Sequence, residues 1–120
     1  MSEIQLGVIE ARFAEIIWSN EPLASSDVVK LAGRELGWKK STTYTVLKRL
    51  CGKGIFKNEG GTVSSLISKS EFYALQSERF VEETFAGSLP AFLAAFTRRK
   101  ALSEEEIASI RKLIEEHKED

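Results

Sequence analysis

The chain has 120 residues, of which 42% are hydrophobic, a size and composition that allow one ordinary domain or two very small ones and argue against wholesale disorder. The formal net charge of −1 argues against a non-specific nucleic-acid coat protein, and the single cysteine excludes an intramolecular disulfide. The N-terminus has no basic region before an apolar run, and no stretch approaches the ~20 apolar residues that span a bilayer, so we expect a cytoplasmic protein that does not insert into the membrane.

Two helices are predicted at the start of the chain. Apolar residues recur at helical spacing over residues 4–19, and Asn20-Glu21-Pro22 ends this first helix. Ser25 or Ser26 is expected to cap a second helix, because a serine hydroxyl can accept a hydrogen bond from a backbone N–H of the first turn. Gly37 is expected to end that helix.

A third helix and a hairpin follow. Ser41 is expected to cap the third helix, which continues to about Lys53 and stops at Gly54. The segment 55–67 then changes to short β-prone pieces around Gly60-Gly61. This pattern predicts a small hairpin with a tight turn.

The remaining residues predict three more helices. Ser68 and Glu71 have the spacing of a capping box at the start of a helix that continues to about Phe85. Pro90 suits the first turn of a short fifth helix. Ser103 opens a second capping box, and the last helix follows it.

The order helix–helix–helix–hairpin is that of a winged helix-turn-helix, in which the third helix is the recognition element and the hairpin is the wing. We therefore predict a mostly α fold with a small β-hairpin wing, made of a winged-helix DNA-binding domain over residues 1–69 and a helical dimerisation region over residues 70–120. Charge follows this division, because residues 1–69 hold ten Lys/Arg against seven Asp/Glu and residues 70–120 hold seven against eleven.

The segment 36–58 carries six Lys/Arg and no Asp or Glu, and we call it the basic segment. On a helix over residues 42–53, the core side would consist of Thr43, Val46, Leu47 and Leu50. The opposite side and its neighbours present hydroxyls, an aromatic ring and cations, which suit a DNA groove. The candidate DNA-binding residues are Lys39, Lys40, Ser41, Thr42, Tyr44, Thr45, Lys48, Arg49 and Lys57.

Two plainer interpretations apply to this segment. Charge runs are usually solvated surface, and Tyr44 could equally pack at the edge of the helix. Helix order, the absence of acids and an outward face of small hydroxyl residues coincide here, and together they favour DNA contact. A winged-helix module that binds protein instead of DNA is the strongest rival from another class.

Residues 70–120 contain many apolar side chains. A segment of this length rarely closes a hydrophobic core alone. These helices could fold back on the winged helix as one monomeric core, but a dimer interface is favoured because it also suits palindromic DNA. The candidate interface residues are Phe72, Leu75, Val81, Phe85, Leu89, Phe92, Leu93, Phe96, Ile107, Ile110, Leu113 and Ile114.

The sequence offers few residues that could act in catalysis or bind a metal ion. His117 is the only histidine and lies in a charged tail, and Cys51 has no histidine near it in the sequence. A buried, inert thiol is the default for Cys51, and a redox switch is the minor alternative. We therefore predict neither an enzyme nor a cofactor or metal site. A third possible class is a regulator with its own small-molecule pocket. The C-terminal half is too short to suggest such a pocket.

Several stretches of the sequence carry a family resemblance in a fixed order. They are Phe13-Ala14-Glu15-Ile16-Ile17-Trp18 with Leu6-Gly7 and Glu10 before it, Gly37-Trp38, Ser41 to Leu50, Lys53-Gly54, Leu66-Ile67-Ser68, Glu71-Phe72, Phe85-Ala86-Gly87-Ser88-Leu89 and Leu102-Ser103 to Leu113. Together they resemble the BlaI/MecI family of penicillinase repressors over essentially the whole chain.

The resemblance implies a homodimeric repressor that binds an inverted-repeat operator in double-stranded DNA through two winged helices. In the branch that controls β-lactam antibiotic resistance, a membrane sensor with a metalloprotease domain cuts the repressor in the fifth-helix region. The corresponding bond in this chain is Ala95–Phe96, where Ala95 replaces the family's usual Asn. The wing, residues 58–65, lacks the family's usual basic and tyrosine residues, and the cysteine cluster of a copper-responsive branch is absent from the end of this sequence.

Overall fold

A computed structural model describes residues 6–117 and divides the chain between Ser77 and Glu78 into two compact units. The first unit contains α1 (Val8–Asn20), β1 (Leu23–Ala24), α2 (Ser25–Leu36), α3 (Lys40–Gly52), β2 (Phe56–Glu59), β3 (Thr62–Ser65) and the first turns of α4 (Lys69–Phe85). The second unit contains the end of α4, α5 (Leu89–Thr97) and α6 (Glu104–Glu116). The predicted class, mostly α with a small β wing, is confirmed.

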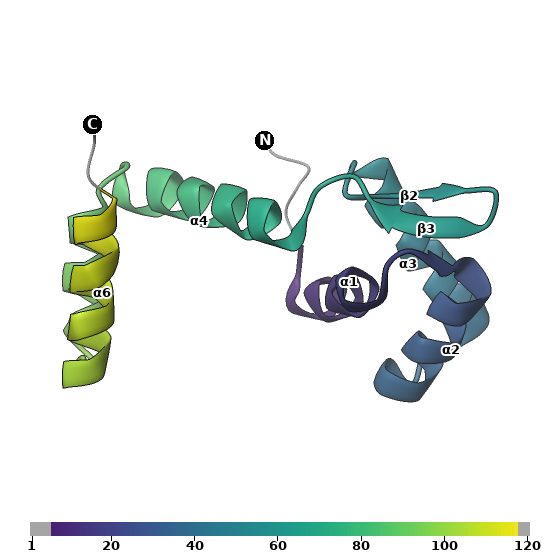
Figure 1. Cartoon of the computed structure of the whole chain (residues 1–120), viewed down its shortest axis with the longest axis horizontal. Helices are drawn as coiled ribbons and strands as arrows, with labels where there is room; N and C mark the ends of the chain where they lie inside the picture. Colours follow the sequence, from purple (N-terminus) through teal and green to yellow (C-terminus); the bar gives the residue numbers. More distant parts are fainter. Residues whose placement is uncertain (1–5, 118–120) are drawn as a thin grey trace. The chain divides into compact units, whose positions relative to one another are not determined.

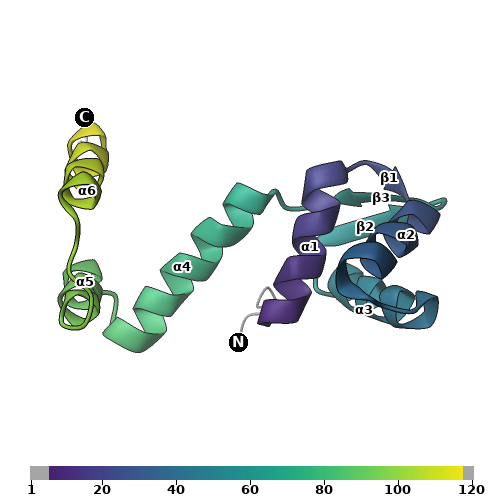
Figure 2. The ribbon, with the colours of Figure 1, turned by 90° about the horizontal axis from the view of Figure 1, so that it is seen from below.

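The first unit is a three-helix group with a small antiparallel sheet, as Figures 1 and 2 show. Helix α1 packs against α2 and β3, and α3 packs against α2 and β2. These contacts enclose one hydrophobic core, whose fully buried members include Phe13, Ile17, Val28, Leu50, Ile55, Phe56 and Val63. The apolar residues that recur at helical spacing in the sequence therefore form a single shared core in this unit.

The wing is the hairpin β2–β3, and its turn matches the prediction. Gly60 and Gly61 have φ values of 59° and 86°, so both lie in the left-handed region that a two-residue hairpin turn requires. The turn fixes the register at Glu59 opposite Thr62. A third strand, β1, was not predicted; it adds Leu23 and Ala24 to the free edge of β3, in the sheet order β1-β3-β2.

Strand β1 explains why the expected cap of α2 was wrong. Pairing with β3 holds Ala24 extended, so Ala24 becomes the N-cap residue and Ser25 is already the first residue of the helix. The backbone N–H of Ser25 donates to the carbonyl oxygen of Gly61 at 2.8 Å, across the sheet. The predicted end of α2 is confirmed, because Gly37 has φ 71° and its N–H donates to Gly33.

The expected helix starts are partly wrong and partly confirmed at the other helices. Helix α3 starts at Lys40 with Lys39 as N-cap, so Ser41 lies inside the first turn instead of capping it. Helix α1 starts at Val8, and residues 4 and 5 of its predicted span lie outside the described residues. The capping box at Ser103 is confirmed, with both reciprocal hydrogen bonds formed.

Phe72 is the clear correction to the predicted dimer surface. Its side chain is fully buried in the core of the first unit, so it is not available to a partner chain. Its ring lies 5.4 Å from the ring of Trp18, and Trp18 also contacts Phe56 at 5.3 Å. The indole N–H of Trp18 donates to the carbonyl oxygen of Ile67 at 3.1 Å. Trp18 thus ties α1 to the wing and to α4.

Phe72→Ala is expected to lower the free energy of unfolding by about 3 kcal/mol or more, because it removes a buried aromatic ring and leaves a cavity. Urea denaturation followed by tryptophan fluorescence measures this loss. Leu66→Ala is the matched control, since Leu66 is 58% exposed and its truncation should change stability by less than about 0.5 kcal/mol. Equal small losses in both variants would contradict the burial of Phe72 in this core.

Candidate nucleic-acid interface

Helix α3 is divided into a buried and an exposed face. Thr43, Val46, Leu47 and Leu50 are buried, as their spacing predicts. Thr43 is the one polar member of this group, and its hydroxyl donates to the carbonyl oxygen of Lys39 at 3.1 Å. The hydroxyl therefore enters the core with its hydrogen bond made, and the helix has one fixed rotation about its axis.

Most of the predicted DNA-binding residues lie on the exposed face of α3 or just before it. Lys39, Lys40, Ser41, Thr42, Thr45, Lys48 and Arg49 are exposed, whereas Tyr44 and Lys57 are half-buried. Tyr44 packs partly against the hydrophobic core, and its hydroxyl lies 3.5 Å from the hydroxyl of Ser25 on α2. Tyr44 thus has a packing role at the helix edge, the alternative that its sequence position left open.

The cations of the basic segment differ in their neighbours. Among the described residues, 6–117, no ion pair forms at Lys39, Lys40 or Lys48, the lysines at the start and middle of α3. Arg49 and Lys53, nearer the end of α3, pair with Glu10 of α1. Lys57 pairs with Glu59 in the wing at 3.4 Å. The cations without a carboxylate partner are therefore concentrated toward the N-terminal part of α3.

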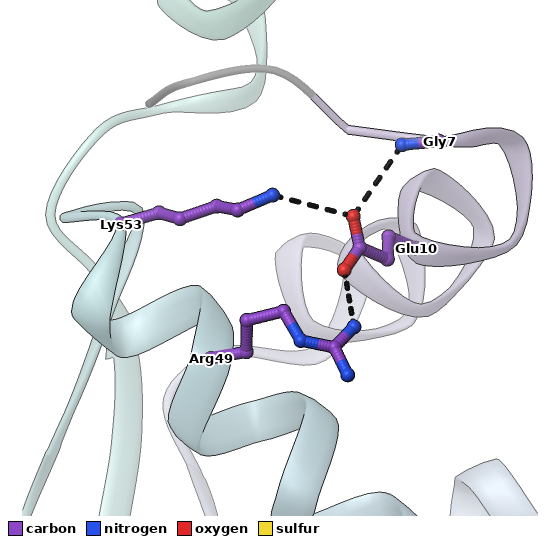
Figure 3. A network of polar contacts seen from close by, with 4 residues as sticks. All are labelled: Gly7, Glu10, Arg49 and Lys53. Carbon is purple, nitrogen blue, oxygen red and sulfur yellow. Dashed lines mark hydrogen bonds and ion pairs between the residues drawn. The ribbon is translucent and has the colours of Figure 1, made fainter. Parts of the chain in front are cut away.

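Glu10 forms a polar network that links α1 to α3, drawn in Figure 3. Arg49 Nη1 lies 2.6 Å from Glu10 Oε2, and Lys53 Nζ lies 3.4 Å from Glu10 Oε1. The backbone N–H of Gly7 donates to Glu10 Oε1 at 3.4 Å and so closes the first turn of α1. The carboxylate is mostly covered, with 18% of its side chain exposed.

The pKa of Glu10 lies below its ordinary value of 4.5. Burial of the carboxyl acts in the opposite direction and raises the pKa. The hydrogen bonds from Arg49 and from the Gly7 N–H, together with the charge and hydrogen bond of Lys53, outweigh burial. Glu10 is therefore ionised at neutral pH and carries the counter-charge for two cations of the basic segment.

Sequence reasoning missed Glu10 as a member of this site. Its partners are 39 and 43 residues away in the sequence, and helical periodicity describes only one helix at a time. A second long-range carboxylate, Glu21, was missed for the same reason. It accepts hydrogen bonds from the backbone N–H of Ser65 at 2.6 Å and from the Ser65 hydroxyl at 2.9 Å, and it anchors the end of β3.

The second unit has an apolar surface without a core of its own. In its described part, residues 78–117, no residue is buried. The rings of Phe80, Phe85, Phe92 and Phe96 form a chain of contacts with centroids 5.6 to 6.1 Å apart. Residues of α5 and α6, among them Phe92, Phe96 and Ile110, line an open hollow. On α6, Leu113 is 68% exposed and Ile114 is 65% exposed.

The other predicted interface residues divide by exposure. Leu75, Leu89, Phe96 and Ile107 are exposed, and Val81, Phe85, Phe92, Leu93 and Ile110 are half-buried. Leu75 belongs to the first unit and the rest belong to the second. The Ala95–Phe96 bond lies near the C-terminal end of α5 in regular helix, with both residues exposed.

The remaining candidate chemistry is limited. Cys51 is half-buried, and desolvation raises the pKa of its thiol above the ordinary value, which disfavours the reactive thiolate. Within residues 6–117, no group of three or more His, Cys, Asp or Glu side chains is arranged to hold a metal ion. None of the helices described here is both long and apolar enough to span a membrane.

Known proteins match this chain both at the level of a family and at the level of a single relative. The sequence profile of the penicillinase repressor family matches residues 6–116. A penicillinase repressor from Bacillus licheniformis is 27% identical to this chain over 118 residues, a span that covers 95% of this chain and 92% of the relative. Both matches extend across the winged helix and the second unit, and they confirm the resemblance inferred from the sequence.

Glu10→Gln is expected to lower the free energy of unfolding by about 1 kcal/mol at pH 7, because it removes the charge that binds two cations. The contribution of a carboxylate with a lowered pKa is complete above the ordinary value of 4.5 and is lost as the pH falls through the folded-state pKa. Urea denaturation should therefore give a constant difference from pH 7 to about pH 5 and a shrinking one below 4.5. Glu59→Gln, at the exposed wing, is the control and should change little at any pH.

Proposed function

This chain belongs to the penicillinase repressor family, and on that premise we propose that it is a homodimeric repressor that binds an inverted-repeat operator in double-stranded DNA through α3. The family consists of transcriptional regulators and is not a family of enzymes. The observation that carries the proposal is the exposed face of α3, where three lysines without a carboxylate partner among the described residues flank or join a row of small hydroxyl side chains.

The chemistry of this face fits a major groove. Ser41, Thr42 and Thr45 offer hydroxyls that can bond base edges or phosphates, and the threonine methyl groups can contact thymine methyl groups. Lys39 and Lys40 lie at the N-terminus of α3, where the free backbone N–H groups also favour an anion such as a phosphate. Lys48 is two turns further along the same helix and adds a second position for a phosphate contact.

The wing has a smaller part in the proposal. Residues 58–65 contain no lysine or arginine, and Lys57 just before them pairs with Glu59. Its turn is built from two glycines, which present no side chain to a phosphate or a base. We therefore assign the main DNA contacts to α3 and the residues that precede it.

The apolar surface of the second unit supports the dimer. Large apolar side chains such as Leu89, Leu113 and Ile114 would remain in water in a single chain, and exposed surfaces of this kind mark interaction sites. A pair related by a two-fold axis covers the same surface on both chains and presents two α3 helices to two half-sites. Proteolysis at Ala95–Phe96 is not needed for this function.

Selection from a random pool of double-stranded DNA is expected to enrich an inverted repeat with fixed half-site spacing. Lys48→Ala should then reduce the magnitude of the salt slope, the dependence of log affinity on log salt concentration, by about 0.9 per protomer, because one phosphate contact is lost. Filter binding or fluorescence anisotropy on the selected duplex at several salt concentrations measures the slope.

Lys112→Ala is the matched control, because Lys112 is an exposed lysine of α6 in the second unit and should leave the slope unchanged. Absence of enrichment at low salt from folded protein would contradict the proposed function. It would favour a winged-helix module that binds protein.

Leu113→Asp is expected to weaken dimerisation by about tenfold or more, since it places a charge on an apolar interface. Sedimentation equilibrium at micromolar concentrations measures the association. Val8→Asp is the control, because Val8 is an apolar residue of α1 in the first unit and, at 78%, is at least as exposed as Leu113. A wild-type chain that sediments as a monomer, or equal effects of both variants, would refute the assigned dimer surface.

A further inference from the structure

The basic segment contains two groups of cations with different environments. Lys39, Lys40 and Lys48 lie on the exposed surface without an ion pair among the described residues. Arg49 and Lys53 are one helical turn apart, on the side of α3 that faces α1, and one carboxylate contacts both. The net charge of the segment does not distinguish the two groups, although within residues 6–117 the first group has no carboxylate partner and the second has Glu10.

The carboxylate of Glu10 holds its two partners in the way a phosphate would. Two separate oxygens accept from two separate cationic donors, at 2.6 Å from Arg49 Nη1 and 3.4 Å from Lys53 Nζ. Charge-assisted hydrogen bonds of this kind are the strong ones, and carboxylate and phosphate oxygens compete for the same guanidinium and ammonium groups. Half of the Arg49 side chain remains exposed, so its guanidinium is near the surface that a DNA backbone could reach.

Contacts with phosphates differ in their consequences from contacts with bases. Lys/Arg contacts to phosphates supply essentially all of the affinity for unrelated DNA, whereas base contacts discriminate between sequences. Withdrawal of a cation from the phosphates therefore weakens binding to every duplex but leaves base discrimination in place. Suppression of excess phosphate contacts therefore raises the ratio of the affinity for the operator to the affinity for unrelated DNA.

We propose that Glu10 is a specificity-determining residue: it occupies the donors of Arg49 and Lys53 and thereby keeps both from the phosphates of unrelated DNA. This inference rests on the proposed function, because it assumes that α3 binds DNA. It changes the role expected for Arg49 from the sequence, where Arg49 was one of the candidate DNA-binding residues. In the assigned role Arg49 is a positioning residue, and its partner is Glu10.

A purely structural role for Glu10 makes a different prediction. If the network only fixed α1 against α3, Glu10→Gln would weaken operator and unrelated DNA together, or change neither. The proposed role requires the opposite sign for unrelated DNA, because removal of the carboxylate releases the guanidinium of Arg49. The sign and salt dependence of binding to unrelated DNA therefore distinguish the two roles.

The experiment compares the full-length wild type with E10Q, R49Q and the double variant E10Q/R49Q. Affinity is measured over a range of salt concentrations on the duplex enriched from the random pool and on an unrelated duplex of equal length. E10Q should bind the unrelated duplex more tightly, with a salt slope steeper by about 0.9 per protomer for the released guanidinium of Arg49. The ratio of operator to unrelated affinity should fall.

Arg49 is tested in both backgrounds. R49Q alone should leave the slope on unrelated DNA unchanged, because Glu10 already holds this guanidinium. In the E10Q background the same substitution should remove about 0.9 of the slope. If R49Q alone reduces the magnitude of the salt slope on unrelated DNA by about 0.9, Arg49 already contacts a phosphate in the wild type. That result would overturn the proposal even if E10Q could not be measured.

Glu15→Gln controls for the change in net charge. Glu15 lies on α1, as Glu10 does, but it pairs with Lys69 at the start of α4 and not with α3. Equal slopes for E10Q and E15Q on unrelated DNA would refute the proposal. Tryptophan fluorescence and thermal unfolding establish that each variant is folded. Failure of the wild type to enrich any sequence would refute the proposed function itself, so the two failures are distinguishable.

Discussion

The burial of one face of α3 is the constraint on which the rest of the molecule depends. Val46, Leu47 and Leu50 insert into the core between α1, α2 and the sheet, and Thr43 joins them with its hydroxyl bonded to the backbone at Lys39. Rotation of the helix by one residue would move an apolar side chain into water and a lysine into the core. The face that Ser41 and its neighbours present is therefore fixed by packing on the opposite side.

Ion pairs make the positive charge of the basic segment uneven along its length. A sequence with six cations and no acids suggests a uniformly positive surface. In the folded unit, Glu10 brings one negative charge from α1 to the last turns of α3, and Glu59 brings another to Lys57. The positive potential is thus concentrated near the start of α3, where the unbonded backbone N–H groups also lie. This concentration arises from tertiary contacts and cannot be seen in the segment itself.

The features that could be predicted from the sequence are those set by local rules. Helical periodicity assigned the two faces of α3, and adjacent glycines predicted the turn at Gly60-Gly61, because only a few residues tolerate positive φ. The capping box at Ser103 was predicted because its hydrogen bonds join residues three apart. Each of these features depends on neighbours within about one helical turn or one hairpin.

The features that could not be predicted depend on residues far apart in the sequence. Strand β1 is two residues long, too short for an alternating pattern, and exists because β3 offers an edge. Phe72 follows the wing and has an apolar character that suits either a core or an interface, and only contact with Trp18 decides between them. Glu10 is one of two acids on α1, and only the positions of Arg49 and Lys53 distinguish it from Glu15.

In the proposed dimer, the role of the second unit is to link two copies of α3 and so to strengthen the DNA contact. One α3, with three lysines that form no ion pair within residues 6–117, can reach few phosphates and few bases, so a single copy would bind weakly. Linkage of two copies makes the second half-site contact intramolecular, and affinity then rises without any new type of contact. The exposed apolar side chains of α5 and α6 therefore complement the small polar face of α3. Suppression of non-specific phosphate contacts by Glu10 fits this arrangement, because a linked pair needs less affinity from each copy and benefits from greater discrimination.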